Sequence, residues 1–484
     1  MKTSKNSRSL SLLTSMLLLI LLTGCGFLSS QPNNSPAITP LALTPTPSTG
    51  GAATGTTTTS IPTATAQPGV SNDWTTYHQN TSRTGYVANT PDPTRLSKTW
   101  NKQLDGAVYA EPLVIGGRVI VATENNSLYA FASKTGQLLW KTNVGTPVPQ
   151  SDLPCGDVDP LGITGTPVYD PVTGLVFAVA EISGPAHLLL GLDVTTGKVK
   201  VRRVADISGM DPTTHQQRAA LALRNGMVYI AYGGLYGDCG DYRGTVVAAR
   251  TDGTGSLLSF RVPTTREGGI WAASGPAIDS QGNIYVAVGN GEATGGNWDH
   301  SDSILRLSPT LKLEDGFAPT SWGDENANDQ DLGSMGPILL PGGWIYTDGK
   351  AQRGYVLKAS NLGGVGGQVA AISICNAFGG AAAIGSQVFV PCTSGLRKIT
   401  VTAGGQISAG WQAPANIQGS PIAGGNTVYD LDPQAGILYA LSSAKGSVRA
   451  QVNVGTATRF ATPTLVDNML FIGTSTGIVG VTLS

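Results

Sequence analysis

A loop rich in oxygen-bearing side chains interrupts what otherwise reads as a pair of β-strands. The segment NIYVAVGNGEATGGNWDHSDSILRLSP (283–309) begins and ends with strand-like apolar residues, and its middle is too long for a hairpin turn. Calcium prefers carboxylate and amide oxygens as ligands. Glu292, Asp299 and Asp302 could therefore bind a structural calcium ion, although we favour a solvated acidic loop. Whether Asn290 holds a ligand depends on where the fold places this loop.

Other reactive residue types form no catalytic pattern. The segment GTSTG (473–477) has the spacing of a serine nucleophile elbow, but the helix that such an elbow needs does not follow it. The histidines are scattered and lack the spacing of a zinc site. Neither CxxC nor CxxCH occurs in the chain, which argues against a zinc ribbon and against covalently bound haem.

The N-terminal residues predict export. Basic residues precede an apolar run over 10–22, which is too short for a confident membrane-spanning helix, and LLTGC follows and ends at Cys25. This ending resembles a bacterial lipobox. The resemblance implies that residues 1–24 are a lipoprotein signal peptide, that Cys25 is lipidated, and that the chain is extracytoplasmic and anchored to the cell membrane through the lipid. An ordinary signal peptide with an incidental cysteine is the alternative.

The composition separates a tether from a folded region. Residues 28–72 are dominated by Thr, Ser, Pro, Gly and Ala, and such a segment cannot bury enough apolar surface to offset its ordering entropy. We therefore expect a lipid anchor and disordered tether over 25–72 and a folded domain over 73–484. The formal net charge of −1 leaves no basic surplus for binding nucleic acid.

A repeat organises the folded region. The chain contains 64 Gly, 29 Pro and only 13% charged residues, which favours short strands and tight turns over helices. A small residue followed by proline opens several units, and two further openings near Ala220 and Ala382 lack the proline. The prolines of the other openings are Pro112, Pro167, Pro276, Pro337, Pro421 and Pro463. Four strand-like segments per unit and eight units predict an all-β, eight-bladed β-propeller.

The two ends of the repeat array predict how the ring closes. The eighth unit stops at Ser484 after three strands, whereas LSKTWNKQL (96–104) precedes the first unit as an isolated strand. We expect this N-terminal strand to complete the last blade, because it would leave no raw sheet edge between the first and last blades.

One repeat carries a family signature. The segment LYAFASKTGQLLW, with Thr135, Gly136 and Trp140, resembles the tryptophan-docking repeat of the pyrroloquinoline-quinone (PQQ) propeller family. In that family the Thr-Gly turn positions a Trp that packs on the adjacent blade. Residues 73–86 also resemble the N-terminal segment of these proteins. The next repeat departs from the pattern, because Val201 stands where the Trp is expected.

The longest connections are expected on one face of the propeller. Loops joining strand 2 to strand 3, and strand 4 to the next blade, emerge on the same side. The extra residues of the first units fall in such loops, at 147–163, 233–244, 289–302 and 318–335. A rigid scaffold that positions long loops often carries the binding site, so this face is the candidate. Tolerated surface insertions are the alternative.

The resemblance to quinoprotein alcohol dehydrogenases implies a cofactor site on this face. Those enzymes hold PQQ and calcium on the propeller axis, where calcium polarises the quinone carbonyl that accepts hydride. The matching positions are Glu181, Asn290 and Asp331 as calcium ligands, Trp271 as the surface under the quinone, Lys350 as the cation beside its oxygens, and Asp331 or Asp329 as the catalytic base.

Departures from the family pattern favour a binding protein over an enzyme. The chain has neither an adjacent Cys–Cys pair nor a haem motif. We therefore favour a lipid-anchored, scaffold-like propeller without cofactor that binds a ligand or an extracytoplasmic partner protein on its loop-rich face. In fold and anchoring it would resemble the propeller lipoprotein of the outer-membrane β-barrel assembly machine. The alternative is a calcium-dependent PQQ dehydrogenase that oxidises an alcohol or a sugar.

The cysteines other than Cys25 predict two disulfides. An even number of cysteines in an exported chain indicates paired thiols, and three connectivities are open. Cys375 ends the fourth strand of the fifth unit and Cys392 ends the second strand of the sixth, so we expect these two to pair across neighbouring blades. Cys155 would then pair with Cys239.

Overall fold

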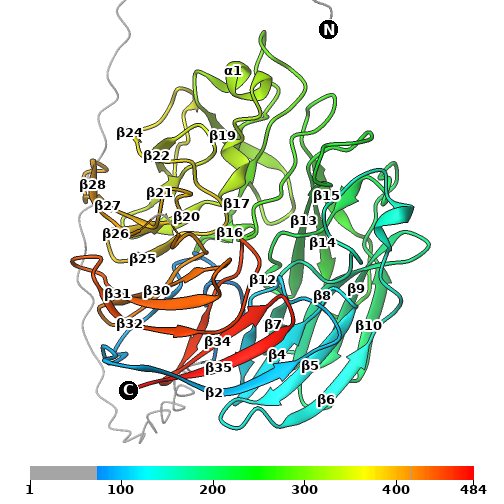
Figure 1. Ribbon diagram of the computed structural model, residues 1–484. Helices are drawn as coiled ribbons and strands as arrows, with labels where there is room; N and C mark the ends of the chain where they lie inside the picture. The colour runs from blue at the N-terminus through cyan, green and yellow to red at the C-terminus, as the bar shows by residue number, and fades with distance from the viewer. Residues whose placement is uncertain (1–72, 415) are drawn as a thin grey trace, which may run out of the picture. The chain divides into compact units, whose positions relative to one another are not determined.

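The computed structural model describes residues 73–414 and 416–484, and within them the strands form eight sheets of the predicted propeller (Figure 1). The expected signal peptide, the lipidation site Cys25 and the tether through residue 72 lie outside the described residues. In the part of the chain that is described, no helix is both long enough and apolar enough to span a membrane.

The first four blades follow one another along the chain. Blade 1 contains β3 (Leu113–Ile115), β4 (Arg118–Ala122), β5 (Ser127–Ala132) and β6 (Leu138–Asn143), and blade 2 contains β7 (Val168–Asp170), β8 (Leu175–Ile182), β9 (Ala186–Asp193) and β10 (Val199–Val204). Blade 3 contains β12 (Ala222–Arg224), β13 (Met227–Gly234), β14 (Thr245–Arg250) and β15 (Leu258–Arg261), with β11 (His215–Gln216) beside β13. Blade 4 contains β16 (Ala277–Ile278), β17 (Ile284–Val288), β18 (Ser303–Leu307) and β19 (Leu313–Ala318), with β23 (Gly364–Val365) at its edge.

The last four blades include both ends of the ring. Blade 5 contains β20 (Ile338–Leu340), β21 (Trp344–Thr347), β22 (Arg353–Lys358) and β24 (Ala370–Ser373), and blade 6 contains β25 (Ala382–Ile384), β26 (Gln387–Val390), β27 (Arg397–Val401) and β28 (Ile407–Gln412). Blade 7 contains β29 (Ile422–Gly424), β30 (Thr427–Asp432), β31 (Ile437–Ser442) and β32 (Val448–Asn453), with β1 (Tyr86–Val87) beside β29. Blade 8 contains β33 (Thr464–Val466), β34 (Met469–Thr474), β35 (Gly477–Leu483) and β2 (Leu96–Gln103).

The predicted closure of the ring is confirmed. Strand β2 pairs antiparallel with β35, from Leu96 opposite Leu483 to Gln103 opposite Gly477. The N-terminal strand is therefore the outer strand of the last blade, as Figure 1 shows beside the C-terminus. The GTSTG segment contributes the turn between β34 and β35, in agreement with its interpretation as a strand turn.

Strand burial follows position in the blade. The second strand of blade 3, β13, is buried at all but its first residue, because it packs against blades on both sides. The outermost strand of blade 1, β6, is exposed at most positions. This gradient explains why the apolar, β-branched segments of the repeat are the second and third strands.

Residues 74–87 run across the propeller axis and hydrogen-bond to the innermost strands. The backbone of Trp74 pairs with Val114 in blade 1, and the carbonyl of Thr75 accepts from the amide of Tyr169 in blade 2. Carbonyls of later residues in this segment accept hydrogen bonds from backbone amides in the innermost strands of further blades. Thr81 accepts from Ile278, Ser82 from Leu339, Thr84 from Ala383 and Gly85 from Ala423. We call residues 74–87 the axial segment.

Two buried side chains extend these contacts to the remaining blades. The Arg83 guanidinium donates to the carbonyls of Leu221 in blade 3 and Pro276 in blade 4, at 3.1 and 3.0 Å. His78 Nε2 lies 3.2 Å from Thr462 Oγ1, next to blade 8. Burial lowers the pKa of His78 to about 3, so the imidazole is neutral at physiological pH.

Tryptophan docking joins several blades at their outer edges. Trp140 of β6 donates its indole N–H to the carbonyl of Val194 in the next blade, at 3.0 Å. A Cβ on Gly197, whose φ is +69°, would lie 2.6 Å from the Trp140 ring, so only glycine fits below it. Trp100 and Trp411 make the same contact with the carbonyls of Ser133 and Ser443. The docking function predicted for the Thr-Gly turn is confirmed.

The expected loop-rich face is also present. Residues 147–163 and 318–335 join the last strand of one blade to the first strand of the next, and residues 233–244 and 289–302 join second to third strands. The 318–335 loop contains the short helices α1 (Trp322–Ala327) and η2 (Leu332–Ser334), and the 147–163 loop contains η1 (Gln150–Asp152).

Both predicted disulfides are confirmed. Cys155 bonds to Cys239 and so links the 147–163 loop to the 233–244 loop. Cys375 bonds to Cys392 between blades 5 and 6, across a sequence separation of 17 residues.

Replacing Arg83 by Lys should destabilise the whole propeller. A lysine cannot reproduce the fork of bonds to Leu221 and Pro276, and it leaves buried carbonyls unpaired at a cost of about 2–4 kcal/mol. Urea unfolding measures the loss. Arg95→Lys is the matched control, since Arg95 is exposed and only eight residues after the axial segment. Equal stability of the two variants would refute the structural importance of Arg83.

Removing the Cys375–Cys392 bond should lower the free energy of unfolding by about 3 kcal/mol, because the bond closes a loop of 17 residues in the unfolded chain. The double variant Cys375→Ala/Cys392→Ala tests this by chemical denaturation. Peptide mapping of the wild-type protein without reductant should recover a peptide that links these two cysteines. Recovery of both as free thiols would contradict the pairing.

Candidate functional site

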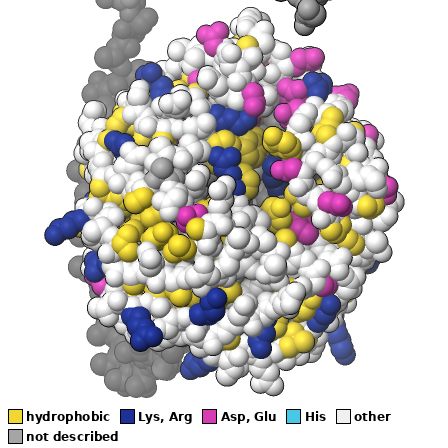
Figure 2. Space-filling view, viewed as in Figure 1, with side chains coloured by type: hydrophobic (Ala, Val, Ile, Leu, Met, Phe, Trp, Pro, Cys, Tyr) yellow, Lys and Arg dark blue, Asp and Glu magenta, His cyan; other side chains and the backbone are white. Residues whose placement is uncertain are grey.

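A cavity of about 490 Å³ opens on the loop-rich face. Its lining comes from the interblade loops and the loops between second and third strands, as the topology predicts for this face. In the space-filling view, hydrophobic and Lys or Arg side chains gather around a hollow near the middle of the face shown (Figure 2). The aromatic and charged lining residues are Tyr109, Asp157, Arg218, Tyr236, Asp238, Tyr242, Trp271, Asp329, Lys350, Phe378, Arg459 and Phe460.

Four of the residues expected at the site lie together at one side of this cavity. Trp271 directs its indole N–H toward Asp331 Oδ1, at 3.4 Å. The backbone amide of Asn290 donates to the same oxygen at 2.7 Å. Lys350 Nζ lies 2.5 Å from Asp331 Oδ2 and 5.7 Å from the centre of the Trp271 ring. Asn290 therefore holds Asp331 through its backbone.

Gly289 allows this close approach. A Cβ at this position would lie 2.2 Å from Asp331 Oδ1 and 2.9 Å from Trp271 Nε1, so any other residue would force the two apart. The Gly-Asn pair in the opening loop thus has a physical role. Its glycine provides space for the contact between Trp271 and Asp331, and its asparagine supplies an amide donor.

Lys350 is held by two carboxylates. Asp331 is its buried partner, and the exposed Asp329 lies 2.7 Å from the same ammonium group. Burial disfavours the charged lysine, but Asp331 and Asp329 outweigh this effect and raise the pKa of Lys350. Burial raises the pKa of Asp329, against the opposing influence of Lys350. Both candidates for a catalytic base are therefore committed to this ion pair.

Asp302 lies behind the pair and is fully buried. Its Oδ1 accepts from the backbone amide of Leu332 at 2.9 Å, while its Oδ2 has no hydrogen-bond partner. Burial and the neighbouring charge of Asp331 raise the pKa of Asp302 well above its usual value.

Glu181 belongs to a separate buried cluster. Its Oε1 accepts from the amide of Gln217 at 2.8 Å, and its Oε2 lies 3.7 Å from Nε2 of His187, whose Nδ1 is 2.6 Å from Asp206. Burial raises the pKa of Glu181 to about 7, partly opposed by His187. The other charged groups with the largest influence on Glu181 are Asp206 and Arg218, and Asp331 is not among them.

The three expected calcium ligands do not fit a calcium ion in this arrangement. Asp331 has one oxygen bound by Asn290 and Trp271 and the other by Lys350. Glu181 accepts from the amide of Gln217 and lies near His187, and Asn290 contacts Asp331 through its backbone amide. A calcium ion needs six to eight oxygen ligands, and here it would also face the positive charge of Lys350.

The acidic residues of the opening loop likewise have separate partners. Asp299 accepts from the amide and hydroxyl of Ser301, and Glu292 accepts from the Thr265 hydroxyl. Among residues 73–414 and 416–484, no group of three or more His, Cys, Asp or Glu side chains is placed to bind a metal ion.

Two arginines that the sequence analysis did not select dominate the cavity. The guanidinium of Arg218 lies 4.9 Å from the centre of the Trp271 ring, and that of Arg459 lies 3.8 Å from the centre of Phe378. The two rings are 6.3 Å apart. Neither guanidinium forms an ion pair within the described residues, and the Nε of Arg218 is buried without a hydrogen-bond partner.

A positional signal in the repeat could have identified these residues. The first strand of each blade starts at the axis, so a residue shortly before each repeat opening faces the cavity. Tyr109 and Phe460 stand three positions before Pro112 and Pro463. Where the proline is missing, Arg218 and Phe378 occupy the equivalent place. This shared position becomes visible when the repeats are aligned on their opening residues, and it is not visible when they are aligned on the Thr-Gly docking turn.

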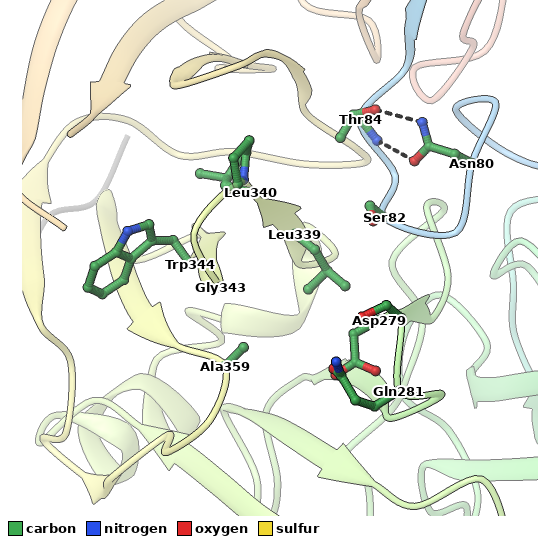
Figure 3. A pocket seen from close by; sticks show the side chains of 12 residues that line it. Asn80, Ser82, Thr84, Asp279, Gln281, Leu339, Leu340, Gly343, Trp344 and Ala359 are labelled. Carbon is green, nitrogen blue, oxygen red and sulfur yellow. Dashed lines mark hydrogen bonds between the residues drawn. The ribbon is translucent and has the colours of Figure 1, made fainter. Parts of the chain in front are cut away.

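A larger cavity, of about 580 Å³, lies on the opposite face (Figure 3). The axial segment lines one side with Asn80, Ser82 and Thr84, and Trp344 and Asp279 lie on other sides. Its polar groups already have partners: Asn80 bonds to Thr84, Asp279 to Asn283 and Tyr285, and the Trp344 indole to the carbonyl of Ala403. We therefore place the candidate site on the loop-rich face.

The chain has several similar proteins. Residues 92–154 match a PQQ-repeat family model described as outer membrane protein assembly factor BamB. A polyvinylalcohol dehydrogenase from Sphingopyxis sp. (strain 113P3) is 24% identical over 273 residues, which are 49% of this chain and 39% of that protein. The match thus spans well under half the length of this curated relative.

Solved structures share the fold. A europium-containing methanol dehydrogenase superposes with a TM-score of 0.67 at 15% identity, over 85% of this chain and 98% of that chain. BamB from Moraxella catarrhalis superposes with a TM-score of 0.56 at 14% identity, over 80% of this chain and 98% of that one. Residues 92–154 thus match a PQQ-repeat family model, and the superpositions show that the described residues share the propeller fold.

Proposed function

We propose that this chain is an exported propeller that binds a planar anionic ligand in the cavity of its loop-rich face, without catalysing a reaction. One observation carries the proposal: two guanidinium groups that have no ion-pair partner among the described residues, those of Arg218 and Arg459, lie against two adjacent aromatic rings in one cavity. Guanidinium groups bind carboxylate and phosphate oxygens through paired hydrogen bonds, and exposed aromatic faces stack on planar ligands.

The acidic residues of the cavity do not cancel these charges directly. Asp329 is paired with Lys350, and Asp238 accepts a hydrogen bond from Tyr242. Asp157 lies near enough to Arg218 to support its charge, but the two form no ion pair. A ligand carboxylate can therefore bind these arginines without displacing a carboxylate of the described residues from an ion pair.

PQQ is a suitable probe, because it is a planar aromatic molecule that carries carboxylates. The family resemblance supports this choice, and so does the name of a solved neighbour, a quinohemoprotein alcohol dehydrogenase from Comamonas testosteroni. The dehydrogenase alternative is not our proposal. It requires a calcium site, and the residues expected to form that site are engaged with other partners.

A partner protein is the second candidate for this face. Tyr236 is 65% exposed beside the cavity. Aromatic residues with this exposure are enriched at protein interfaces. The likeness to BamB concerns the fold alone and supports no specific partner.

Titration of the purified protein with PQQ, followed by quenching of tryptophan fluorescence, tests the ligand proposal. We expect saturable binding that Arg459→Gln weakens about tenfold or more, since a charge-assisted hydrogen bond contributes about 1.5–3 kcal/mol. Arg224→Gln is the matched control, because Arg224 lies in the β12–β13 hairpin on the opposite face. Absent binding, or equal affinities of the two variants, would refute the proposal.

We also propose that Cys25 is lipidated and anchors the propeller outside the cytoplasm. The two disulfides support export, because such bonds persist in oxidising compartments. Cys25→Ser should abolish incorporation of labelled fatty acid and move the protein from the membrane fraction to the soluble one, or leave it unprocessed. Processing and membrane retention equal to the wild type would show that the cysteine is incidental.

A further inference from the structure

Resting on the proposed function, we infer that Arg218 supplies the positive charge for the ligand at the place where a divalent cation would be required, so that ligand binding is independent of metal. Arg218 lines both the main cavity and a smaller one of about 60 Å³ that adjoins it. Trp271, Gln216 and Thr164 also line this small cavity. Its volume is on the order of two water molecules, which suits one carboxylate group.

Contacts connect Arg218 to both groups of acidic residues. The backbone amide of the adjacent Gln217 binds Glu181, and the Arg218 guanidinium rests on Trp271, whose indole N–H points to Asp331. Burial lowers the pKa of Arg218, and Asp157, Asp238 and Asp331 oppose this effect. The guanidinium therefore brings a positive charge to the side of the cavity where the expected calcium ligands lie.

The backbone around Arg218 fixes the side chain in this place. The amide of its neighbour Gln217 is bound to Glu181, at 2.8 Å. The guanidinium donates to the carbonyl of Gly234 at 3.3 Å and rests on Trp271. Among the described residues, its buried Nε–H has no hydrogen-bond partner. A buried, unpaired donor is unfavourable, and a bound carboxylate would pair it.

A metal ion would compete unfavourably at the same place. Arg218 and Lys350 both lie over Trp271, so a divalent cation would meet two positive charges in a partly desolvated site. The oxygens of Asp331 would have to exchange hydrogen bonds from Asn290 and Lys350 for coordination. Direct binding of a carboxylate by Arg218 needs no such rearrangement.

The experiment compares PQQ binding by wild-type protein treated with EDTA and by the same protein with added calcium. We expect dissociation constants that agree within about twofold. Arg218→Gln should weaken binding at least tenfold or so in both conditions, because the charge-assisted hydrogen bonds are lost. Circular dichroism and urea unfolding of this variant establish that it is folded. Arg218→Lys should recover only part of the affinity, since an ammonium group lacks the planar fork.

The outcomes separate this inference from the proposed function. Binding that requires calcium overturns the inference alone, because the cavity would still bind the ligand. Wild-type affinity in a folded Arg218→Gln variant also overturns the inference alone. Absence of PQQ binding in both conditions overturns the proposed function and the inference with it.

A second measurement uses a metal alone. Tb³⁺ bound near Trp271 would emit light when the indole is excited, and calcium would displace it. If the site binds no metal, the wild-type protein should show no terbium emission that calcium suppresses and that the Trp271→Phe variant lacks. Such an emission would contradict the inference without reference to any ligand.

Discussion

Eight inner strands meet around the axis of this propeller, and each presents unpaired backbone groups to it. The axial segment crosses the ring and forms backbone hydrogen bonds with one inner strand after another. The side chains of Arg83 and His78 form further hydrogen bonds with residues next to inner strands. Buried backbone groups without partners are expensive, so the ring depends on this short stretch that belongs to none of the repeats.

The axial segment also separates the two faces. Its residues Asn80, Ser82 and Thr84 line the cavity on one face, whereas none of the segment lines the cavity on the other. The site on the loop-rich face is thus built entirely from loops that leave the blades. Two of these loops are joined by the Cys155–Cys239 bond, which limits how far they can move apart. The hydrogen-bonded ring and this disulfide both restrict the movement of residues that line the cavity.

The site brings together part of the residue set that the resemblance to PQQ-repeat propellers implies. Trp271, Asp331 and Lys350 lie together, and Gly289 provides the space for their contact. Glu181 contacts His187 and the amide of Gln217, and the guanidinium of the adjacent Arg218 rests on Trp271. A pocket of this kind is suited to holding an anion, whereas polarising a carbonyl through a metal requires free carboxylate oxygens.

The sequence by itself determined the features that repeat or that act locally. Prolines at fixed places in each unit, the docking turn at Thr135 and Gly136, and the isolated strand before the first unit predict eight blades and their closure, because each is encoded within a few neighbouring residues. The pairing of Cys375 with Cys392 followed from the register of two neighbouring blades. Trp271, Asp331 and Lys350 were selected because the segments around them resemble those of the quinoprotein alcohol dehydrogenases.

Only the tertiary structure decided which groups those residues contact. The bond from the backbone amide of Asn290 to Asp331 was not predicted from the sequence. The contacts of Glu181 with Gln217 and His187 were not predicted either. Arg218 and Arg459 stand shortly before two repeat openings, but they come to line one cavity only when the ring closes. Hydrogen bonds and charge interactions depend on ångström-scale distances between residues far apart in the chain, which spacing along a sequence does not contain.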